Sequence, residues 1–352
     1  MSNKSRDNFI DVLRGISIIA IVQTHTTKVL PCGFEIAEFM LCFCVIAFMF
    51  ASGYLFKPVS DSKGVYLQIG KRFVKLWYLF FAYSIAMIAL NPILLRLGII
   101  GSELNIGTID SIYRAFTMHN EQHLLYPMWF VPMFLVASCI FTAVFAFAER
   151  RRHKVLWHCG LAVLCALVGL YSYVVQVYPD YYVNASLLCI PLMYIGYIAG
   201  QRKEIFKHCL TWWGGIIAMA AVLFVVSRDL GTIDLSSHSI ISPALFYPVA
   251  AAGLYMALSF SKYLARVPYL SSVLACAGRN SFHIMALHLL VFKLFDALVG
   301  RIKGLDAAVY QVFPAAFDFW PIYVIVGTAV SIAIAELGKY LIAVYNKHTV
   351  HQ

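Results

Sequence analysis

Ten apolar segments, each close to the length that crosses a lipid bilayer, constrain this chain more than any other feature of its sequence. A membrane-spanning helix needs about 20 predominantly apolar residues. The segments occupy approximately residues 9–28, 36–57, 73–95, 127–148, 155–177, 183–200, 210–227, 241–260, 281–300 and 319–344. Hydrophobic residues make up 61% of the 352 and charged residues 12%, whereas about a quarter of a soluble domain is charged. The sequence predicts an all-α polytopic membrane protein with about ten transmembrane helices, forming one domain over residues 1–352.

The basic residues are distributed unevenly between the gaps that separate these segments. Of the 27 Lys and Arg residues, 19 lie in gaps on the side of the N-terminus and 7 lie in gaps on the opposite side. Cytoplasmic loops of membrane proteins carry an excess of Lys and Arg. We therefore expect both termini in the cytoplasm, and we attribute the net charge of +10 to topology rather than to nucleic-acid binding. The first segment has no small-residue cleavage site and is expected to remain as a membrane helix.

The nine cysteines do not show the paired short spacing of a zinc site. Most of them fall inside apolar segments, and only Cys32 lies in a gap that is predicted to be outside the cell. One outer thiol cannot form an intramolecular disulfide. We expect no metal site and no disulfide framework, and we treat these cysteines as small hydrophobic residues.

Charged and titratable side chains interrupt the first apolar segment. Arg14 and His25 are 11 residues apart, which on an α-helix places them about 20° apart around the axis and roughly 16.5 Å apart along it. Asp11, three residues before Arg14, is expected on the same face. Charged groups within a span usually face the bundle interior and pair there. An arginine that snorkels to the headgroups and an interfacial histidine with one structural hydrogen bond are the simpler alternatives.

The longest outer gap, residues 96–126, carries several polar side chains, including His119, Glu121 and His123. Polar loops over the outer face would suit an acceptor site, and solvated connectors are the plain alternative. The spacing of these three residues superficially resembles a set of metal ligands. Three neighbouring residues in a loop are weak support for a metal, so we predict none.

Five short motifs follow one another in a fixed order between residues 6 and 288. They are RDNFIDVLRGISIIAIVQTH with Arg14 and His25, FMFASGYLF with Ser52 and Gly53, KRFVKLWYLFF with Arg72 and Lys75, MWFVPMFL with Trp129 and Phe130, and SFHIMALH with Ser281 and His288. As an ordered set they resemble the acyltransferase-3 family of membrane acetyltransferases. Short chains of this kind resemble the sugar O-acetyltransferases of bacterial surface polysaccharides, including the fucose O-acetylase group.

The resemblance implies an inner-membrane enzyme that moves an acetyl group from acetyl-CoA to a hydroxyl of an extracytoplasmic glycan or its lipid-linked precursor. The catalytic residues would be His25, as general base or as transient acetyl carrier, and Asp11, which would pair with Arg14 or Lys75. The donor-binding residues would be Arg14, Arg72, Lys75 and His288, the first three receiving the phosphates of acetyl-CoA. We place His288 in the cytoplasmic half of its span, where a core hydrogen bond is the alternative role.

On the acceptor side we expect Trp129, Ser52, His123 and Glu121 to contact substrate, although helix packing is the simpler explanation for Trp129 and Ser52. A secondary transporter or lipid-linked glycan flippase is the main rival function. Such folds often show matching Gly or Pro interruptions in two halves of the chain, and no obvious matching pair is present here. A catalytically silent membrane sensor with the same fold is a third possibility.

Overall fold

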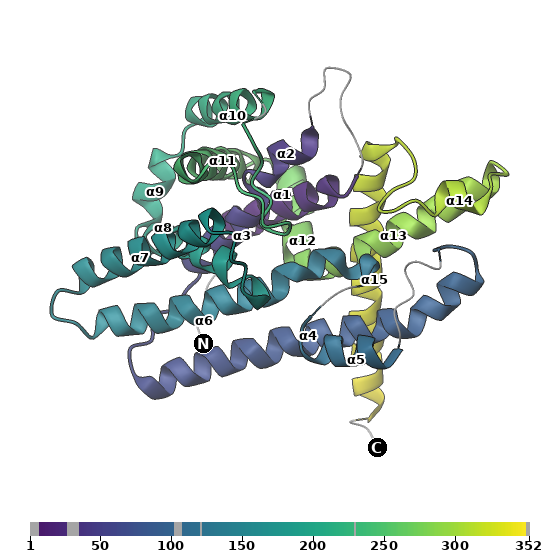
Figure 1. The fold of residues 1–352 in the computed structure, drawn as a ribbon, viewed down its shortest axis with the longest axis horizontal. Coiled ribbons are helices and arrows are strands. Elements are labelled where there is room, and N and C mark those ends of the chain that lie inside the picture. The colour runs from purple at the N-terminus through teal and green to yellow at the C-terminus, as the bar shows by residue number, and fades with distance from the viewer. Residues whose placement is uncertain (1–6, 27–34, 102–107, 120–121, 229, 350–352) are drawn as a thin grey trace.

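A computed structural model gives the fold of residues 7–26, 35–101, 108–119, 122–228 and 230–349. Apart from one β-bridge between Asp234 and Ser239, every regular element in these residues is helical, as predicted (Figure 1). In chain order the elements are α1 (Asn8–Thr24), α2 (Ile36–Leu41), α3 (Cys44–Tyr54), α4 (Ser62–Arg96), α5 (Thr108–Phe116), η2 (His123–Trp129), α6 (Phe130–Glu149), α7 (Lys154–Val174), η3 (Asp180–Tyr182), α8 (Val183–Gln201), α9 (Lys203–Cys209), α10 (Trp212–Ser227), α11 (Pro243–Leu264), α12 (Pro268–Arg279), α13 (Ser281–Ile302), α14 (Ala307–Tyr310) and α15 (Trp320–Thr349).

Each of the ten apolar segments contains helix. Within the described residues, eight helical stretches are long and apolar enough to cross a membrane, and there are up to nine if α9 and α10, bent by 64°, form one span. The remaining segment is α1, whose 17 residues extend about 25 Å, less than the roughly 30 Å of a hydrocarbon core. The protein is therefore a multi-pass membrane protein, and its first predicted span is a short helix.

The main element that the sequence did not predict is α12, which lies in the expected gap between the eighth and ninth segments. It has 12 residues, begins with Pro268 and ends with Arg279, so it is too short to be recognised as a span. Helix α5 similarly occupies part of the 96–126 gap, and α4 begins at Ser62, well before the predicted start at residue 73. Hydrophobic length identifies spanning helices but does not detect short helices that are held by tertiary packing.

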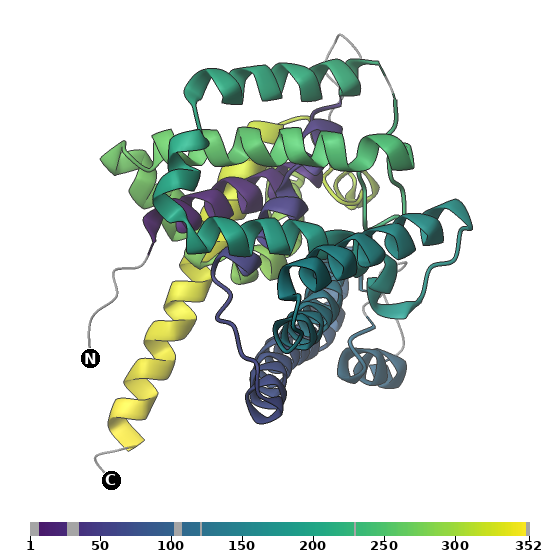
Figure 2. The same ribbon diagram turned by 90° about the vertical axis from the view of Figure 1, so that its left-hand side faces the viewer.

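Helix α1 lies in the middle of the bundle and packs against α3, α11, α12 and α13 (Figures 1 and 2). Twelve of its 17 residues are buried. Two glycines make its crossing with α12 close, because a Cβ at Gly15 would collide with the carbonyl oxygen of Leu274, and a Cβ at Gly278 with that of Asp11. Small residues allow membrane helices to approach to backbone contact. Helix α1 is thus held firmly inside the protein and does not face lipid along its length.

The helices around α1 differ in how much of their surface they bury. In both ribbon views α10 and α11 are stacked at one edge of the bundle, and α4 lies at the opposite edge. Helix α13 buries 14 of its 22 residues, whereas α7 buries three of 21. Exposed apolar side chains on a peripheral helix are expected in lipid, which is as apolar as they are. Helices α1 and α13 therefore carry several buried polar side chains, including Asp11, Ser17 and Gln23 on α1 and His288, Lys293 and Asp296 on α13.

Candidate active site

A cavity of about 400 Å³ lies between α1, α3, α4, α6 and α13. Three cationic side chains line it, Arg14 from α1 and Arg72 and Lys75 from α4. Ser52 and Ser281 add hydroxyl groups, and the remaining lining is apolar. Among the described residues no carboxylate lines this space, which we call the cationic cavity. A cleft lined by one sign of charge with low-dielectric walls concentrates ligands of the opposite sign, so this cavity is suited to an anion.

The two arginines of the cationic cavity are held differently. The Nη2 atom of Arg14 donates a hydrogen bond of 3.0 Å to the Ser281 hydroxyl. The Arg72 guanidinium lies 5.9 Å from the ring centre of Phe134, and its Nη1 atom is buried with no hydrogen-bond partner in the described part of the chain. Leaving a buried charged donor unsatisfied costs free energy. A ligand that brings an acceptor oxygen would remove that cost.

A second, smaller cavity of about 140 Å³ contains the ring of His25 in its lining. Tyr126 and Trp129 of η2 and Asp234 and Ser236 of the α10–α11 connection complete its polar and aromatic wall. We call it the histidine cavity. It adjoins the cationic cavity, because the two share lining residues on α1, α6 and α13.

The hydrogen bonding of His25 fixes which ring nitrogen is free. Its Nδ1 atom lies 2.8 Å from the carbonyl oxygen of Ile21, one turn earlier on α1. A carbonyl oxygen can only accept, so Nδ1 carries the proton of the neutral ring. Nε2 then has its lone pair free, which is the state that a general base or a nucleophile requires.

His288 lies beside His25, and the two ring centres are 5.0 Å apart. Because His25 ends the helix that starts at the N-terminus, expected in the cytoplasm, and His288 is expected in the cytoplasmic half of its span, the sequence predicts that the two histidines lie apart. That prediction is wrong. Helices α1 and α13 run alongside each other, with Arg14 bonded to Ser281 near one end. From residue 281 to residue 288, α13 advances by seven steps, or about 10 Å, whereas α1 advances by 11 steps, or about 16 Å, from residue 14 to residue 25. The contact between the two rings therefore requires the helices to be tilted relative to each other. The His288 Nδ1 atom bonds to the Ile284 carbonyl, and its Nε2 atom is buried without a partner in the described chain.

Asp11 is buried, with 4% of its surface exposed, but it does not line either cavity in the described structure. Three helical residues separate it from Arg14, which turns it about 60° away from that side chain. The backbone carbonyl of Asp11 faces Gly278 of α12. The expected single stripe therefore holds for Arg14 and His25, whereas Asp11 lies beside it.

The residues predicted for the acceptor side separate into different places. Trp129 lines the histidine cavity, with its ring centre 5.0 Å from that of Tyr182. Ser52 lines the cationic cavity instead, and its hydroxyl is buried with no partner in the described residues. His123 is exposed and contacts the Phe313 ring at 5.4 Å, outside both cavities. Glu121 lies outside the described residues.

Sequence reasoning missed Asp234 and Ser236 in the α10–α11 connection. The Asp234 carboxylate accepts hydrogen bonds from the backbone nitrogen and hydroxyl of Ser236, at 2.9 and 2.5 Å, and from the Ser237 hydroxyl at 2.8 Å. Ser236 also lies 3.2 Å from the Tyr126 hydroxyl of η2. The Asp-Leu-Ser-Ser run is a turn signal. It predicts an ordered turn, but only the fold shows that this turn lies against His25.

Comparison with known protein families identifies the family of this chain. A family model described as an acyltransferase domain matches residues 7–336, which include both cavities and, apart from Arg6 at the start of the first, all five motifs. Comparisons with curated proteins and with solved structures give no match. The family match covers nearly the whole chain, and the helices that it covers are those of a multi-pass membrane protein. The chain therefore belongs to the acyltransferase-3 family, as its motifs had suggested.

Proposed function

We propose that this protein is an inner-membrane O-acetyltransferase that moves an acetyl group from cytosolic acetyl-CoA to a sugar hydroxyl outside the cytoplasm. The acceptor is a surface polysaccharide, such as an O-antigen or exopolysaccharide, or its lipid-linked precursor, as for the fucose O-acetylase group that the motifs resemble. The observation that carries this proposal is the contact between two unlike cavities, one lined by three cations and one lined by His25.

The cationic cavity suits the donor. Acetyl-CoA carries several phosphates, and Arg binds phosphate through charge-assisted, often bidentate hydrogen bonds. In this proposal Arg14, Arg72 and Lys75 hold those phosphates, and the pantetheine arm extends along α1 toward His25. Asp11 acts as a positioning residue, keeping the Arg14 guanidinium directed at the donor. Both termini are cytoplasmic in this arrangement, as the distribution of basic residues predicts.

The histidine cavity suits the chemistry. The acceptor hydroxyl oxygen attacks the thioester carbonyl carbon while His25 Nε2 takes the hydroxyl proton. The ester C–O bond forms, the thioester C–S bond breaks, and the CoA sulfur leaves as a thiol with the proton returned by His25. In the covalent alternative, Nε2 attacks first and carries the acetyl group to the hydroxyl in a second step. His288, packed against His25, keeps that imidazole in place.

The test compares purified protein in lipid nanodiscs with its His25→Ala variant. With isotopically labelled acetyl-CoA and surface polysaccharide from cells that lack the gene, mass spectrometry should detect added acetyl groups only for the parent. Loss of a general base lowers the rate about 10²- to 10⁴-fold. His153→Ala is the matched control, because His153 is exposed in the turn between α6 and α7, away from both cavities.

Three results would contradict this assignment. The first is transfer at the parental rate by His25→Ala, which would remove the histidine from the chemistry. The second is a parent that neither releases CoA nor labels the polysaccharide, which would remove the acetyltransferase itself. The third is movement of a lipid-linked glycan across the bilayer without CoA release, which would favour a flippase.

A further inference from the structure

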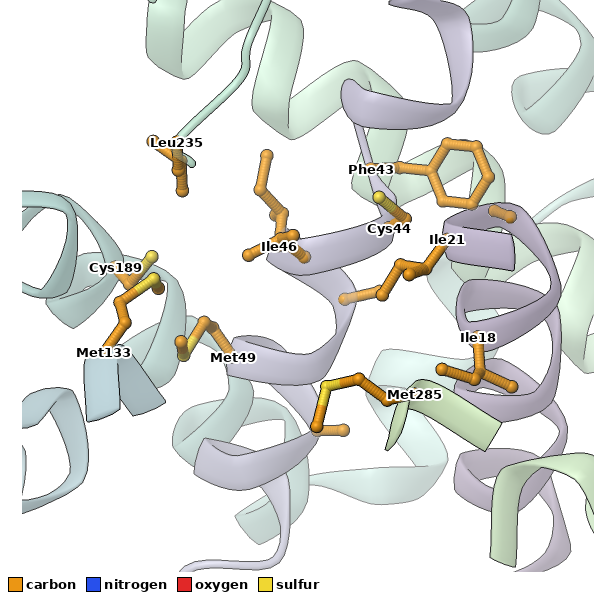
Figure 3. Close-up of a cluster of buried hydrophobic side chains, with 14 of the residues drawn as sticks. Ile18, Ile21, Phe43, Cys44, Ile46, Met49, Met133, Cys189, Leu235 and Met285 are labelled. Carbon is orange, nitrogen blue, oxygen red and sulfur yellow. The ribbon is translucent and has the colours of Figure 1, made fainter. Parts of the chain in front are cut away.

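Three residues line both cavities at once: Ile21 of α1, Phe130 at the start of α6 and Met285 of α13. We call this set the shared wall. Figure 3 shows Ile21 projecting from α1 toward α3, and Met285 projecting from α13 into the space beside it. All three side chains are apolar, so the part of a ligand that lies between the cations and His25 meets no hydrogen-bonding side chain in the shared wall. In an acyl thioester the matching part is the acyl chain.

The three residues differ in how freely they can move. The Phe130 ring packs against Phe48 and Phe134, with ring centres 5.7 and 5.5 Å apart. Ile21 is β-branched and has one strongly preferred rotamer on a helix. Met285 is unbranched, with three rotatable bonds, so it adapts to the space that is left. Met285 is therefore the member of the shared wall whose side chain changes shape most readily.

The two cavities also differ in size. The histidine cavity, about 140 Å³, has roughly a third of the volume of the cationic cavity, about 400 Å³. An acyl chain that reaches His25 has to pass the shared wall and share the smaller space with the acceptor hydroxyl. Ile21 and Met285 are largely buried, with 8% and 5% of their surfaces exposed. Each further methylene of the acyl chain therefore has to fit beside side chains that are already enclosed.

We infer that the shared wall selects the acyl group by length and that Met285 is the residue that sets the limit. This inference rests on the proposed transferase function and names its donor class as short-chain acyl thioesters. The transfer step is the one given above, with the C–S bond broken and the ester C–O bond formed. One methylene in an apolar pocket changes kcat/KM about 10- to 200-fold.

The experiment measures kcat/KM for acetyl-, propionyl- and butyryl-CoA with the purified full chain in nanodiscs. Met285→Ala should raise the butyryl-to-acetyl ratio about tenfold, because it removes the side chain that closes the passage. Met285→Phe should lower the propionyl-to-acetyl ratio by a similar factor. Ile21→Val, which shortens the side chain by one carbon, should also raise the butyryl-to-acetyl ratio, by a smaller factor than Met285→Ala. This variant still tests the inference if either Met285 variant fails to fold.

The control is Met256→Ala, in the buried face of α11 and outside both cavities, which should leave the ratios unchanged. Ratios that are equal in the parent, Ile21→Val and the folded Met285 variants would overturn the inference while leaving the proposed function intact. A parent that releases no CoA from any of the three donors would overturn both. If Met256→Ala changed the kcat/KM ratios as much as the Met285 variants do, the cause would be a general loss of helix packing. That result would also overturn the inference.

Discussion

Charged side chains gather in two parts of this protein, and the two parts are built differently. On the later half of α13, Lys293 and Asp296 are both fully buried and lie 2.6 Å apart. Lys293 also donates to the carbonyl oxygens of Tyr310 and Val312, and Asp296 accepts from the Tyr323 hydroxyl of α15. Every charge in this group has a partner within the protein. The group joins α13, α15 and the segment after α14, and it is closed to ligands.

The cationic cavity shows the opposite arrangement, with three cations in its lining and no carboxylate from the described chain. The Arg72 Nη1 atom, without a hydrogen-bond partner in the described residues, is the clearest case. A buried ion pair that is satisfied internally ties helices together, whereas a cavity lined by charge of one sign attracts a ligand of the opposite sign. We therefore assign the Lys293–Asp296 pair a structural role and the cationic cavity a role in binding. Substitutions in each group test this assignment.

The largest effect is expected from Lys293→Met, which keeps the volume of the side chain and leaves Asp296 buried without its cation. Breaking a buried ion pair by removing one partner costs about 3–5 kcal/mol. We expect a clear fall in the unfolding temperature, measured by intrinsic fluorescence in detergent. The double variant Lys293→Met with Asp296→Leu should recover most of it, because no charge is then left unpaired. A single variant as stable as the parent would show that this pair is not structural.

At the cationic cavity the expected effect is on the ligand instead of the fold. Arg72→Gln should weaken acetyl-CoA binding about 10- to 100-fold, since a hydrogen bond to a charged group contributes about 1.5–3 kcal/mol. The unfolding temperature should stay close to that of the parent, because Arg72 gives up no ion pair of the described chain. Calorimetry measures the affinity, with Arg151→Gln in the exposed turn after α6 as the control. Unchanged affinity together with lost stability would reverse the assignment of the two regions.

A smaller loss is expected from Tyr323→Phe, which leaves Lys293 in place but removes the hydroxyl that donates to Asp296 and accepts from the Phe317 backbone nitrogen at 3.2 Å. A hydrogen bond to a charged acceptor contributes about 1.5–3 kcal/mol. The unfolding temperature should therefore lie between those of the parent and Lys293→Met, with unchanged acetyl-CoA affinity. A loss as large as that of Lys293→Met would show that the hydroxyl, and not the ammonium, holds the Asp296 charge.

The smallest effect concerns His238, in the α10–α11 connection outside the spans. Its ring stacks on Tyr178 and Tyr182, at 4.5 and 5.1 Å between ring centres, and burial lowers its pKa against a weaker opposite effect of Asp234. A lowered pKa means that the unfolded chain takes up the proton more readily, so stability falls as the pH drops below about 6.5.

The measurement for His238 is the unfolding temperature at about pH 7.5 and about pH 5.5. Part of the decrease on acidification should be missing in His238→Asn, because asparagine does not titrate and tolerates the backbone φ of 55° found here. An identical decrease in both proteins would show that this histidine does not affect the stability of the loop.

Several parts of the candidate site could be predicted from the sequence because they depend on local spacing. The placement of Arg14 and His25 on one face follows from helical geometry, and the ordered motifs indicated that Arg72 and Lys75 belong with Arg14. Contacts between distant segments could not be predicted in this way. The packing of His288 against His25 depends on the tilt between α1 and α13, and the place of Asp234 depends on how a loop folds over a helix end.

The sequence by itself determined that this chain is an all-helical membrane protein of the acyltransferase-3 type, because apolar length and motif order are properties of the linear chain. The tertiary structure alone decided that α1 is enclosed by α12 through Gly15 and Gly278, and that the cavity lined by three cations lies next to the histidine cavity. The physical reason is that helices in lipid find their neighbours through close packing of small residues and satisfaction of polar groups, and both are set by contacts between segments far apart in sequence.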